Sequence, residues 1–387
     1  MPDFLERQAS EQYLTSSQFL AQDLRQVISL PQTRQVLLGK NDLFPLKPAF
    51  SDRDIPTYRK TNRLMGIPYS RDSPLKAFYT DHYVLPLPPG HRFPMEKYSQ
   101  LRDLVTQLDG VELVEAPAVS DTQILYAHDP SYLVKVISGS LSSKEQQEIG
   151  FPWSELMVER SRRSAGATVA AAKAALNEGL AANLAGGTHH AYRNMGSGFC
   201  VFNDSAIVAR VLQKEIHSKL KVAIVDLDVH QGNGTASILQ NDSSIFTLSI
   251  HGENNFPFTK EQSDLDIGLP NGCEDGDYLK ALNQGLEILD KFKPDFIIYL
   301  AGADPHEGDR LGKLNISKVG MRQRDETVFQ HGRDRQIPIA FSMAGGYGKE
   351  IQTTVDIHFQ TIQVALGLRR DYFSPITGDS TESSTEA

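Results

Sequence analysis

Short apolar runs alternate with helical patterns over most of the chain. Four near-continuous apolar runs predict buried strands, at 222–228, 244–250, 296–303 and 337–344. Helical patterns occupy 277–291, 317–331 and 353–368, and an alanine-rich stretch over 154–185 predicts one further long helix. Strands that are apolar throughout and alternate with helices are typical of parallel sheets buried on both faces. The pattern therefore predicts an α/β fold with a mostly parallel central sheet, covered by helices on both faces.

The two ends of the chain lack this pattern. Residues 1–76 are polar and mixed, with one amphipathic helical pattern near 17–30, and we interpret them as an N-terminal extension of unknown role. Residues 374–387 contain no apolar side chain beyond Ile376 that would offset the entropy of ordering, so we expect a disordered C-terminal tail, which we assign to residues 371–387. This leaves residues 77–370 as a single predicted domain, in which we find no internal repeat.

Composition and charge narrow the class of protein. The 39 Lys and Arg residues are outnumbered by 48 Asp and Glu residues, and the net charge of −9 argues against broad nucleic-acid binding, which needs a basic surface. No apolar run approaches the roughly 18 residues of a membrane-spanning helix. Two cysteines cannot form a disulfide framework, and the N-terminal residues show no convincing signal or transit pattern. We therefore expect a cytoplasmic protein, with the nucleus as the alternative compartment.

Acidic residues and a histidine follow two of the predicted strands. Alternation along the strand places Asp226, Asp228 and His230 on one side, and an Asp and a His two positions apart can chelate one divalent metal. A solvated acidic turn is the alternative for these residues alone. Asp304 follows the run 296–303 directly, where a carboxylate is costly unless it is paired or binds a metal. Two carboxylates and one histidine with an open position indicate a catalytic zinc rather than a closed structural site.

Two further motifs carry candidate catalytic groups. His189 and His190 are adjacent in a glycine-rich segment and could act together on a metal-bound water and a leaving group; a turn with structural histidines is the alternative. Asp226 and Asn233 are the candidate partners that orient them. Tyr347 lies in a glycine turn at the end of the last predicted strand, where its hydroxyl would suit a developing oxyanion, with a plain surface turn as the alternative.

The order and content of these motifs resemble a known family. GGTHHAYRNMGSGFCVFND, VDLDVHQGNGT, LAGADPHEGDRLG and MAGGYG, in this order, resemble the zinc-dependent histone deacetylases. PLPPGHRFPMEKY and VDIHFQTI further resemble the class IV branch and related bacterial deacetylases. The resemblance covers residues 77 to about 368 and implies one three-layer α/β domain of the arginase/deacetylase type.

The resemblance assigns roles to individual residues. It implies that Asp228, His230 and Asp304 bind one zinc ion per chain and that Tyr347 stabilises the transition state. Asp226 and Asn233 fall on the partners of the paired histidines His189 and His190, and family members carry either Asp or Asn at the position of Asn233.

The resemblance also implies two features around these residues. Gly198 and Phe199 match a tunnel for the acyl-lysine side chain, and Phe256 or Phe258 would supply its opposite wall. Asp226 together with Ser249 matches a structural potassium site.

The activity implied is hydrolysis of an amide, which removes acetyl or longer acyl groups from lysine side chains of histones or other proteins. No direct contact with nucleic acid is expected, and the acidic chain would favour basic peptides. Three alternatives stay open. An acetylpolyamine deacetylase shares every catalytic residue, whereas a binuclear ureohydrolase would need carboxylates where this chain has Gly232 and His306. A non-catalytic scaffold would be expected to lose a metal ligand or the tyrosine.

Overall fold

The computed structural model describes residues 73–370 together with residues 372 and 373. The strands within these residues are β1 (Leu75–Tyr79), β2 (Val111–Glu115), β3 (Leu180–Asn183), β4 (Val222–Asp226), β5 (Ile245–Gly252), β6 (Leu265–Leu269), β7 (Phe296–Leu300) and β8 (Ile339–Ser342). They form one sheet in the order β2-β1-β3-β8-β7-β4-β5-β6, and every neighbouring pair is parallel. The α/β fold with a parallel sheet is therefore confirmed, and the four predicted strands correspond to β4, β5, β7 and β8.

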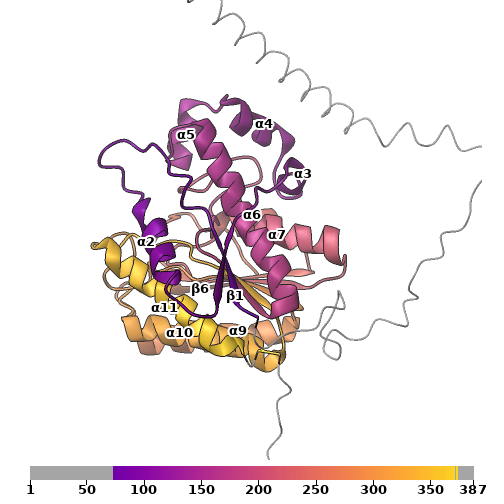
Figure 1. Ribbon diagram of the computed structural model, residues 1–387, viewed down its shortest axis with the longest axis vertical. Coiled ribbons are helices and arrows are strands. Elements are labelled where there is room, and N and C mark those ends of the chain that lie inside the picture. Colours follow the sequence, from indigo (N-terminus) through magenta and orange to yellow (C-terminus); the bar gives the residue numbers. More distant parts are fainter. Residues whose placement is uncertain (1–72, 371, 374–387) are drawn as a thin grey trace, which may run out of the picture. The chain divides into compact units, whose positions relative to one another are not determined.

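Helices cover both faces of this sheet (Figure 1). The core on one face draws on α3 (Asp121–Ile124), α4 (Pro130–Ser138), α5 (Ser143–Ile149), α6 (Glu155–Glu178), α7 (Asp204–Val211), the π-helical turn η1 (Leu212–Ile216) and α8 (Asn233–Leu239). The core on the other face draws on α2 (Glu96–Val105), α9 (Asp275–Phe292), α10 (Lys318–Arg335) and α11 (Ile351–Arg369). The last three helices are those predicted from the apolar pattern. No helix in the described part of the chain is long and apolar enough to cross a membrane.

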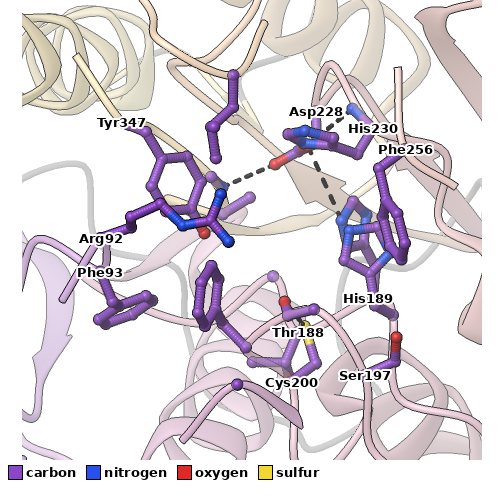
Figure 2. Close-up of a pocket in the computed structure, with 18 of the residues that line it drawn as sticks. Arg92, Phe93, Thr188, His189, Ser197, Cys200, Asp228, His230, Phe256 and Tyr347 are labelled. Atoms are coloured by element: carbon purple, nitrogen blue, oxygen red, sulfur yellow. Dashed lines mark hydrogen bonds and ion pairs between the residues drawn. The ribbon is translucent and has the colours of Figure 1, made fainter. Parts of the chain in front are cut away.

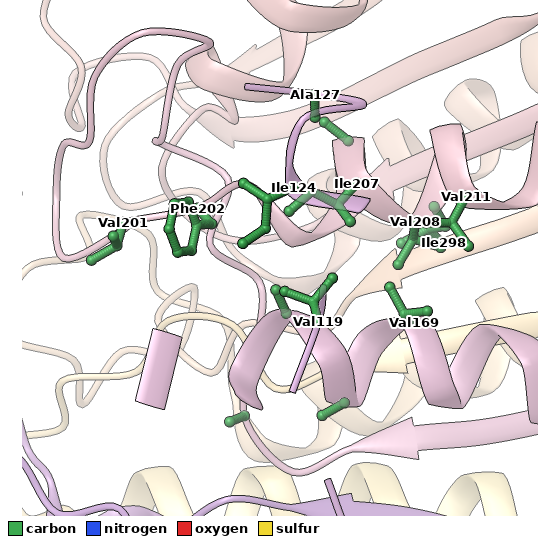
Figure 3. Packing of buried hydrophobic residues seen from close by; sticks show 14 of the residues in the cluster. Val119, Ile124, Ala127, Val169, Val201, Phe202, Ile207, Val208, Val211 and Ile298 are labelled. Carbon is green, nitrogen blue, oxygen red and sulfur yellow. The ribbon is translucent and has the colours of Figure 1, made fainter. Parts of the chain in front are cut away.

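The two faces of the sheet have separate apolar cores. Consecutive residues of β7 alternate between them, so that Ile298 packs in the core with α6 and α7 and Tyr299 packs in the core with α9 and α10. Figure 3 shows Ile298 beside Val208 and Val211 of the first core. Because both faces are buried, the strands appear in the sequence as uninterrupted apolar runs rather than as alternating ones.

The helix predicted over 154–185 is too long, because its last residues form a strand. The helix α6 ends at Glu178, and Gly179 follows with a positive φ of 84°, which a residue without a side chain adopts readily. Leu180–Asn183 then forms β3, which pairs with β1 and β8 in the sheet. Leucine and alanine favour a helix by intrinsic propensity, so the pairing with neighbouring strands is what makes this segment extended.

Both predicted domain boundaries shift slightly in the structure. The strand β1 begins at Leu75, which is fully buried and donates its N–H to Gly110 O, so the sheet includes two residues that the sequence assigns to the extension. Tyr372, assigned to the tail, is also fully buried, and its hydroxyl donates to Ile337 O at 2.8 Å. Residues 1–72, with the helix predicted near 17–30, and residues 371 and 374–387, with the predicted disordered tail, lie outside the described residues.

Candidate metal centre and catalytic pocket

The order of the strands brings three distant side chains together. The strands β4 and β7 are parallel neighbours, so the loops that follow them leave the sheet at the same edge. Asp228 and His230 lie on the first loop and Asp304 on the second, and one ligand atom from each lies within 4.8 Å of the others. His230 Nδ1 lies 2.9 Å from Asp228 Oδ1 and 3.4 Å from Asp304 Oδ2. These are the three residues that the sequence predicts as metal ligands.

The surroundings of the two carboxylates fit a cation. Asp228 Oδ2 accepts the N–H of Gly345 at 2.7 Å, and Asp304 Oδ1 accepts the N–H of Val229 at 2.9 Å. Asp304 Oδ2, in contrast, is buried and has no hydrogen-bond partner. Burial and the neighbouring Asp228 carboxylate raise the pKa of Asp304 well above its usual range. A divalent ion between the carboxylates would relieve this repulsion, and two carboxylates with one imidazole are a donor set that suits zinc.

The loop after β8 leaves room for the candidate metal site. A Cβ atom at Gly345 would lie 1.9 Å from Asp304 Oδ2 and 2.5 Å from Asp228 Oδ2. No side chain fits there unless the carboxylates move. The sequence marks Gly345 only as part of a glycine turn, since its approach to two other loops depends on the strand order.

The adjacent histidines have different partners. His189 Nδ1 lies 2.6 Å from Asp226 Oδ2, and His190 Nδ1 lies 2.7 Å from Asn233 Oδ1. The amide of Asn233 is oriented by a second bond, because its Nδ2 donates to the hydroxyl of Tyr192 at 2.8 Å. Nδ1 of His190 must therefore donate, which leaves the lone pair of a neutral ring on Nε2. The structure thus brings together both pairs that the sequence predicts.

These partners push the two imidazoles toward opposite charge states. Burial lowers the pKa of His189, but the carboxylates of Asp226 and Asp228 outweigh it and raise the pKa to about 9. Burial lowers the pKa of His190 well below 6.5, and the positive charges of His189 and His230 lower it further. Two adjacent groups with separated pKa values are an arrangement suited to acid and base roles in one reaction.

Tyr347 faces the same cavity from the loop after β8. Its N–H donates to Asp309 Oδ2 at 2.6 Å and its carbonyl accepts the N–H of Arg310 at 3.1 Å, so the loop is held on both sides of the residue. Burial raises the pKa of the Tyr347 hydroxyl well above 10, which keeps it protonated as a donor. Figure 2 shows Tyr347 and Phe93 on one side of the cavity and His189 on the other.

The cavity has a volume of about 740 Å³ and is lined by most of these residues. Phe199, with Gly198 beside it, lines one wall, and its ring centre lies 6.0 Å from that of Tyr347. The Phe256 ring stands against the His190 ring, with the centres 4.9 Å apart and the planes at 85°. Of the two candidates for the opposite wall, Phe256 is therefore the inner one, since Phe258 is 85% exposed at the mouth.

Comparison with known proteins decides the family. The model of the histone deacetylase domain matches residues 91–362. The chain belongs to the histone deacetylase family. An uncharacterized protein of Picosynechococcus sp. is 45% identical over 285 residues, covering 72% of this chain and 94% of that protein. Histone deacetylase 2 of Arabidopsis thaliana is 30% identical over 297 residues, covering 73% of this chain and 76% of that protein.

A solved structure supports the same assignment at the level of the fold. The crystal structure of a histone deacetylase homologue from Aquifex aeolicus superimposes with a TM-score of 0.67 at 24% identity, covering 77% of this chain and 85% of that one. The predicted family and its arginase/deacetylase-like α/β fold are confirmed. The chain is thus a hydrolase of the histone deacetylase type.

Two further points from the sequence concern a structural potassium ion and the alternative of a second metal ion. Asp226 and Ser249, which the sequence links to potassium, are register partners in β4 and β5. The hydroxyl of Ser249 lies 3.0 Å from His251 Nδ1. Among the described residues, one group of three or more His, Cys, Asp or Glu side chains is close enough to hold a metal, namely Asp228, His230 and Asp304. The described residues therefore form no second cluster of this kind for a binuclear centre.

A buried basic residue that contacts the loop of Asp304 is not predicted from the sequence. Arg324 of α10 is fully buried and donates from Nη1 to the carbonyl of Gly302, two positions before Asp304, at 2.5 Å. It is paired with Asp325 at 2.8 Å. Within the sequence it is one charged residue on a mostly polar helix, so no local signal marks it as buried.

Proposed function

We propose that this histone deacetylase family member is a zinc-dependent hydrolase that removes acyl groups from lysine side chains of proteins. The observation that carries the proposal is the convergence of a three-residue metal site, two oriented histidines and a buried tyrosine hydroxyl on one cavity. Zinc held by Asp228, His230 and Asp304 would supply Lewis acidity, which polarises an amide carbonyl and makes water more acidic. The proposal includes one zinc per chain and a structural potassium ion beside Asp226 and Ser249.

The residues of the chain account for the remaining steps. His190 Nε2, with Asn233 holding Nδ1, takes the proton of the attacking water as general base. His189, paired with Asp226, carries a proton and belongs to the pair that returns one to the leaving lysine amine. The Tyr347 hydroxyl donates to the developing oxyanion. Phe199 and Phe256 flank the apolar stem of the lysine, so that only the acyl end reaches the histidines.

The charges in the cavity favour a protein substrate over a polyamine. Its lining includes four cationic side chains, the buried Lys97 and Arg160 and the exposed Arg92 and Lys313, and two carboxylates, of which Asp228 belongs to the candidate metal site and Glu148 is exposed. A polyamine is cationic along its whole length and would be repelled by this wall, whereas the lysine being deacylated is uncharged at its amide. Acetylpolyamines are therefore the substrates with which acyl-lysine peptides are compared in the assay below.

The test combines metal analysis with an assay of acyl-lysine peptides and acetylpolyamines. We expect one zinc per chain, hydrolysis of acyl-lysine peptides, and loss of both metal and activity in Asp228→Ala and His230→Ala, because two ligands leave an incomplete site. Asp103→Ala, which alters an exposed carboxylate on α2, is the matched control and should keep both. Two ions per chain, or full activity after chelation, would contradict a mononuclear zinc enzyme. Exclusive hydrolysis of acetylpolyamines would contradict the proposal that the substrate is an acylated lysine of a protein.

A further inference from the structure

Two basic side chains from distant helices line the cavity beside Tyr347. Lys97 lies on α2 and is 2% exposed, and Arg160 lies on α6 and is 7% exposed. Both lie close to the ring of Tyr98, with Lys97 Nζ 5.2 Å and Arg160 Cζ 4.9 Å from its centre. The cavity therefore has two cations near one aromatic ring, both almost completely removed from solvent.

The contacts of these cations are aromatic faces and carbonyl groups. Lys97 Nζ donates to the carbonyls of Ala344 and Gly346 at 3.3 Å each, and it lies 5.5 Å from the ring centre of Tyr347. The guanidinium of Arg160 lies 5.6 Å from the ring centre of Phe93, and its buried Nε has no hydrogen-bond partner. Such contacts stabilise a cation only in part.

Neither cation has a carboxylate partner among the described residues. Of the two carboxylates that line the cavity, Asp228 belongs to the metal site and Glu148 is exposed. A buried charge without a counter-ion is costly, which is why buried cations are ordinarily paired. An anion that enters from the cavity would supply the counter-ion that both cations lack.

We propose that Lys97 and Arg160 bind the distal carboxylate of a dicarboxylic acyl group, so that the preferred substrates are succinyl-lysine or glutaryl-lysine. This inference rests on the proposed acyl-lysine hydrolysis and specifies its acyl group. An extended succinyl group separates its two carbonyl carbons by about 4 Å and a glutaryl group by about 5 Å. Lys97 Nζ lies 5.5 Å from the ring centre of Tyr347, the residue that carries the proposed oxyanion donor, so this cation and the reacting carbonyl belong to the same region of the cavity.

The reaction is balanced with water as the only co-substrate. The hydroxyl of water is added to the acyl carbon, the amide C–N bond breaks, and the lysine nitrogen takes both protons of the water, the second from the newly formed carboxylic acid. The products are a free lysine side chain and a dicarboxylate, whose distal carboxylate carries the same charge as in the substrate. An acetyl group has no second carboxylate, so an acetylated lysine would offer the two cations no counter-ion.

The test uses the full chain and peptides of one sequence that carry acetyl-, pentanoyl-, succinyl- or glutaryl-lysine. Pentanoyl is the neutral match for succinyl in length. We expect kcat/KM for succinyl- or glutaryl-lysine to exceed that for pentanoyl-lysine by about tenfold or more, the usual gain from a charge-assisted contact. In Arg160→Met this ratio should fall about tenfold, and Arg160→Lys, which keeps the charge, should retain most of it. Arg162→Met is the control, because Arg162 on the same helix is paired with Asp121 and does not line the cavity.

A binding measurement separates this inference from the proposed function. Calorimetric titration with succinate and pentanoate should show tighter binding of succinate to the parent chain, and this difference should be lost in Arg160→Met and kept in Arg162→Met. Hydrolysis of acetyl-lysine without any preference for the dicarboxylic groups, or an equal effect of Arg160→Met on all peptides, would overturn the inference and leave the proposed function standing. Absence of hydrolysis of every acyl-lysine peptide would overturn both.

Discussion

Gly345→Ala should weaken zinc binding more than any other change of one methyl group at the site. The backbone N–H of Gly345 donates to Asp228 Oδ2 at 2.7 Å, and the added Cβ would lie 1.9 Å from Asp304 Oδ2 and 2.5 Å from Asp228 Oδ2. Its φ lies outside the left-handed range, so alanine can adopt the backbone conformation without strain. The perturbation is therefore steric and acts on the two carboxylates.

The size of the effect follows from these distances. Real Cβ atoms essentially never approach other heavy atoms within 3.0 Å, so Asp304 Oδ2 must move by about 1 Å. Metal ligands function within about 0.2 Å of their ideal distances. Changes that merely disturb the partners of metal ligands weaken metal binding by about 10- to 100-fold, and this one displaces a ligand itself, so we expect a loss of about 100-fold or more.

The assay is competition for zinc with a chromophoric chelator, alongside circular dichroism and thermal unfolding. Gly367→Ala is the control, because Gly367 is exposed near the end of α11 and an added Cβ there meets nothing within 4 Å. This control should keep the parent's zinc affinity and gain up to about 1 kcal/mol of stability from helix propensity. If the Gly345→Ala chain is folded and its zinc affinity is within about threefold of the parent's, then Asp228, His230 and Asp304 are not the zinc ligands.

Three further predictions address catalysis, stability and domain organisation. Tyr347→Phe should keep its zinc while kcat falls by about 100-fold, the usual cost of one oxyanion donor; a raised KM at unchanged kcat would contradict this role. Burial lowers the pKa of His128 from 6.5 to about 4, and its Nε2 accepts the N–H of Asn203. Its contribution to stability is thus complete above pH 6.5 and is lost as the pH falls toward 4, by about 2 kcal/mol at pH 5. Urea unfolding should show a shallower acid loss in His128→Gln, and an unchanged slope would contradict it. A chain that begins at residue 73 should keep zinc and the rate of the full chain, whereas aggregation would show that residues 1–72 belong to the fold.

The parts of the fold that the sequence predicts are those where burial is continuous. The strands β4, β5, β7 and β8 lie inside the sheet, and their residues face a core on both sides, so their apolar runs are unmistakable. The outermost strands β2 and β6 carry exposed and half-buried residues and were missed. The central strand β3 was missed for a different reason, since its leucine and alanines favour a helix and only the pairing with β1 and β8 makes it extended.

The site was predictable where chemistry is concentrated within one motif. Asp228 and His230 are two residues apart, and His189 and His190 are adjacent, so their spacing alone suggests joint action. Lys97 and Arg160 carry no such signal, because they lie on separate helices and their burial results from tertiary packing. An isolated lysine or arginine in a sequence is most often at the surface.

Net charge is the feature of the sequence that says least about the cavity. A chain with a net charge of −9 attracts basic peptides, yet the cavity wall carries four cations and two carboxylates. Both statements hold because exposed charges are screened over about 8 Å at physiological ionic strength, whereas the buried charges of Lys97 and Arg160 are screened much less. The outer surface therefore acts on the peptide around the modified lysine, and Lys97 and Arg160 act on the acyl group alone. Recognition of a basic peptide and of an acidic acyl group are thus independent requirements, which one chain can satisfy together.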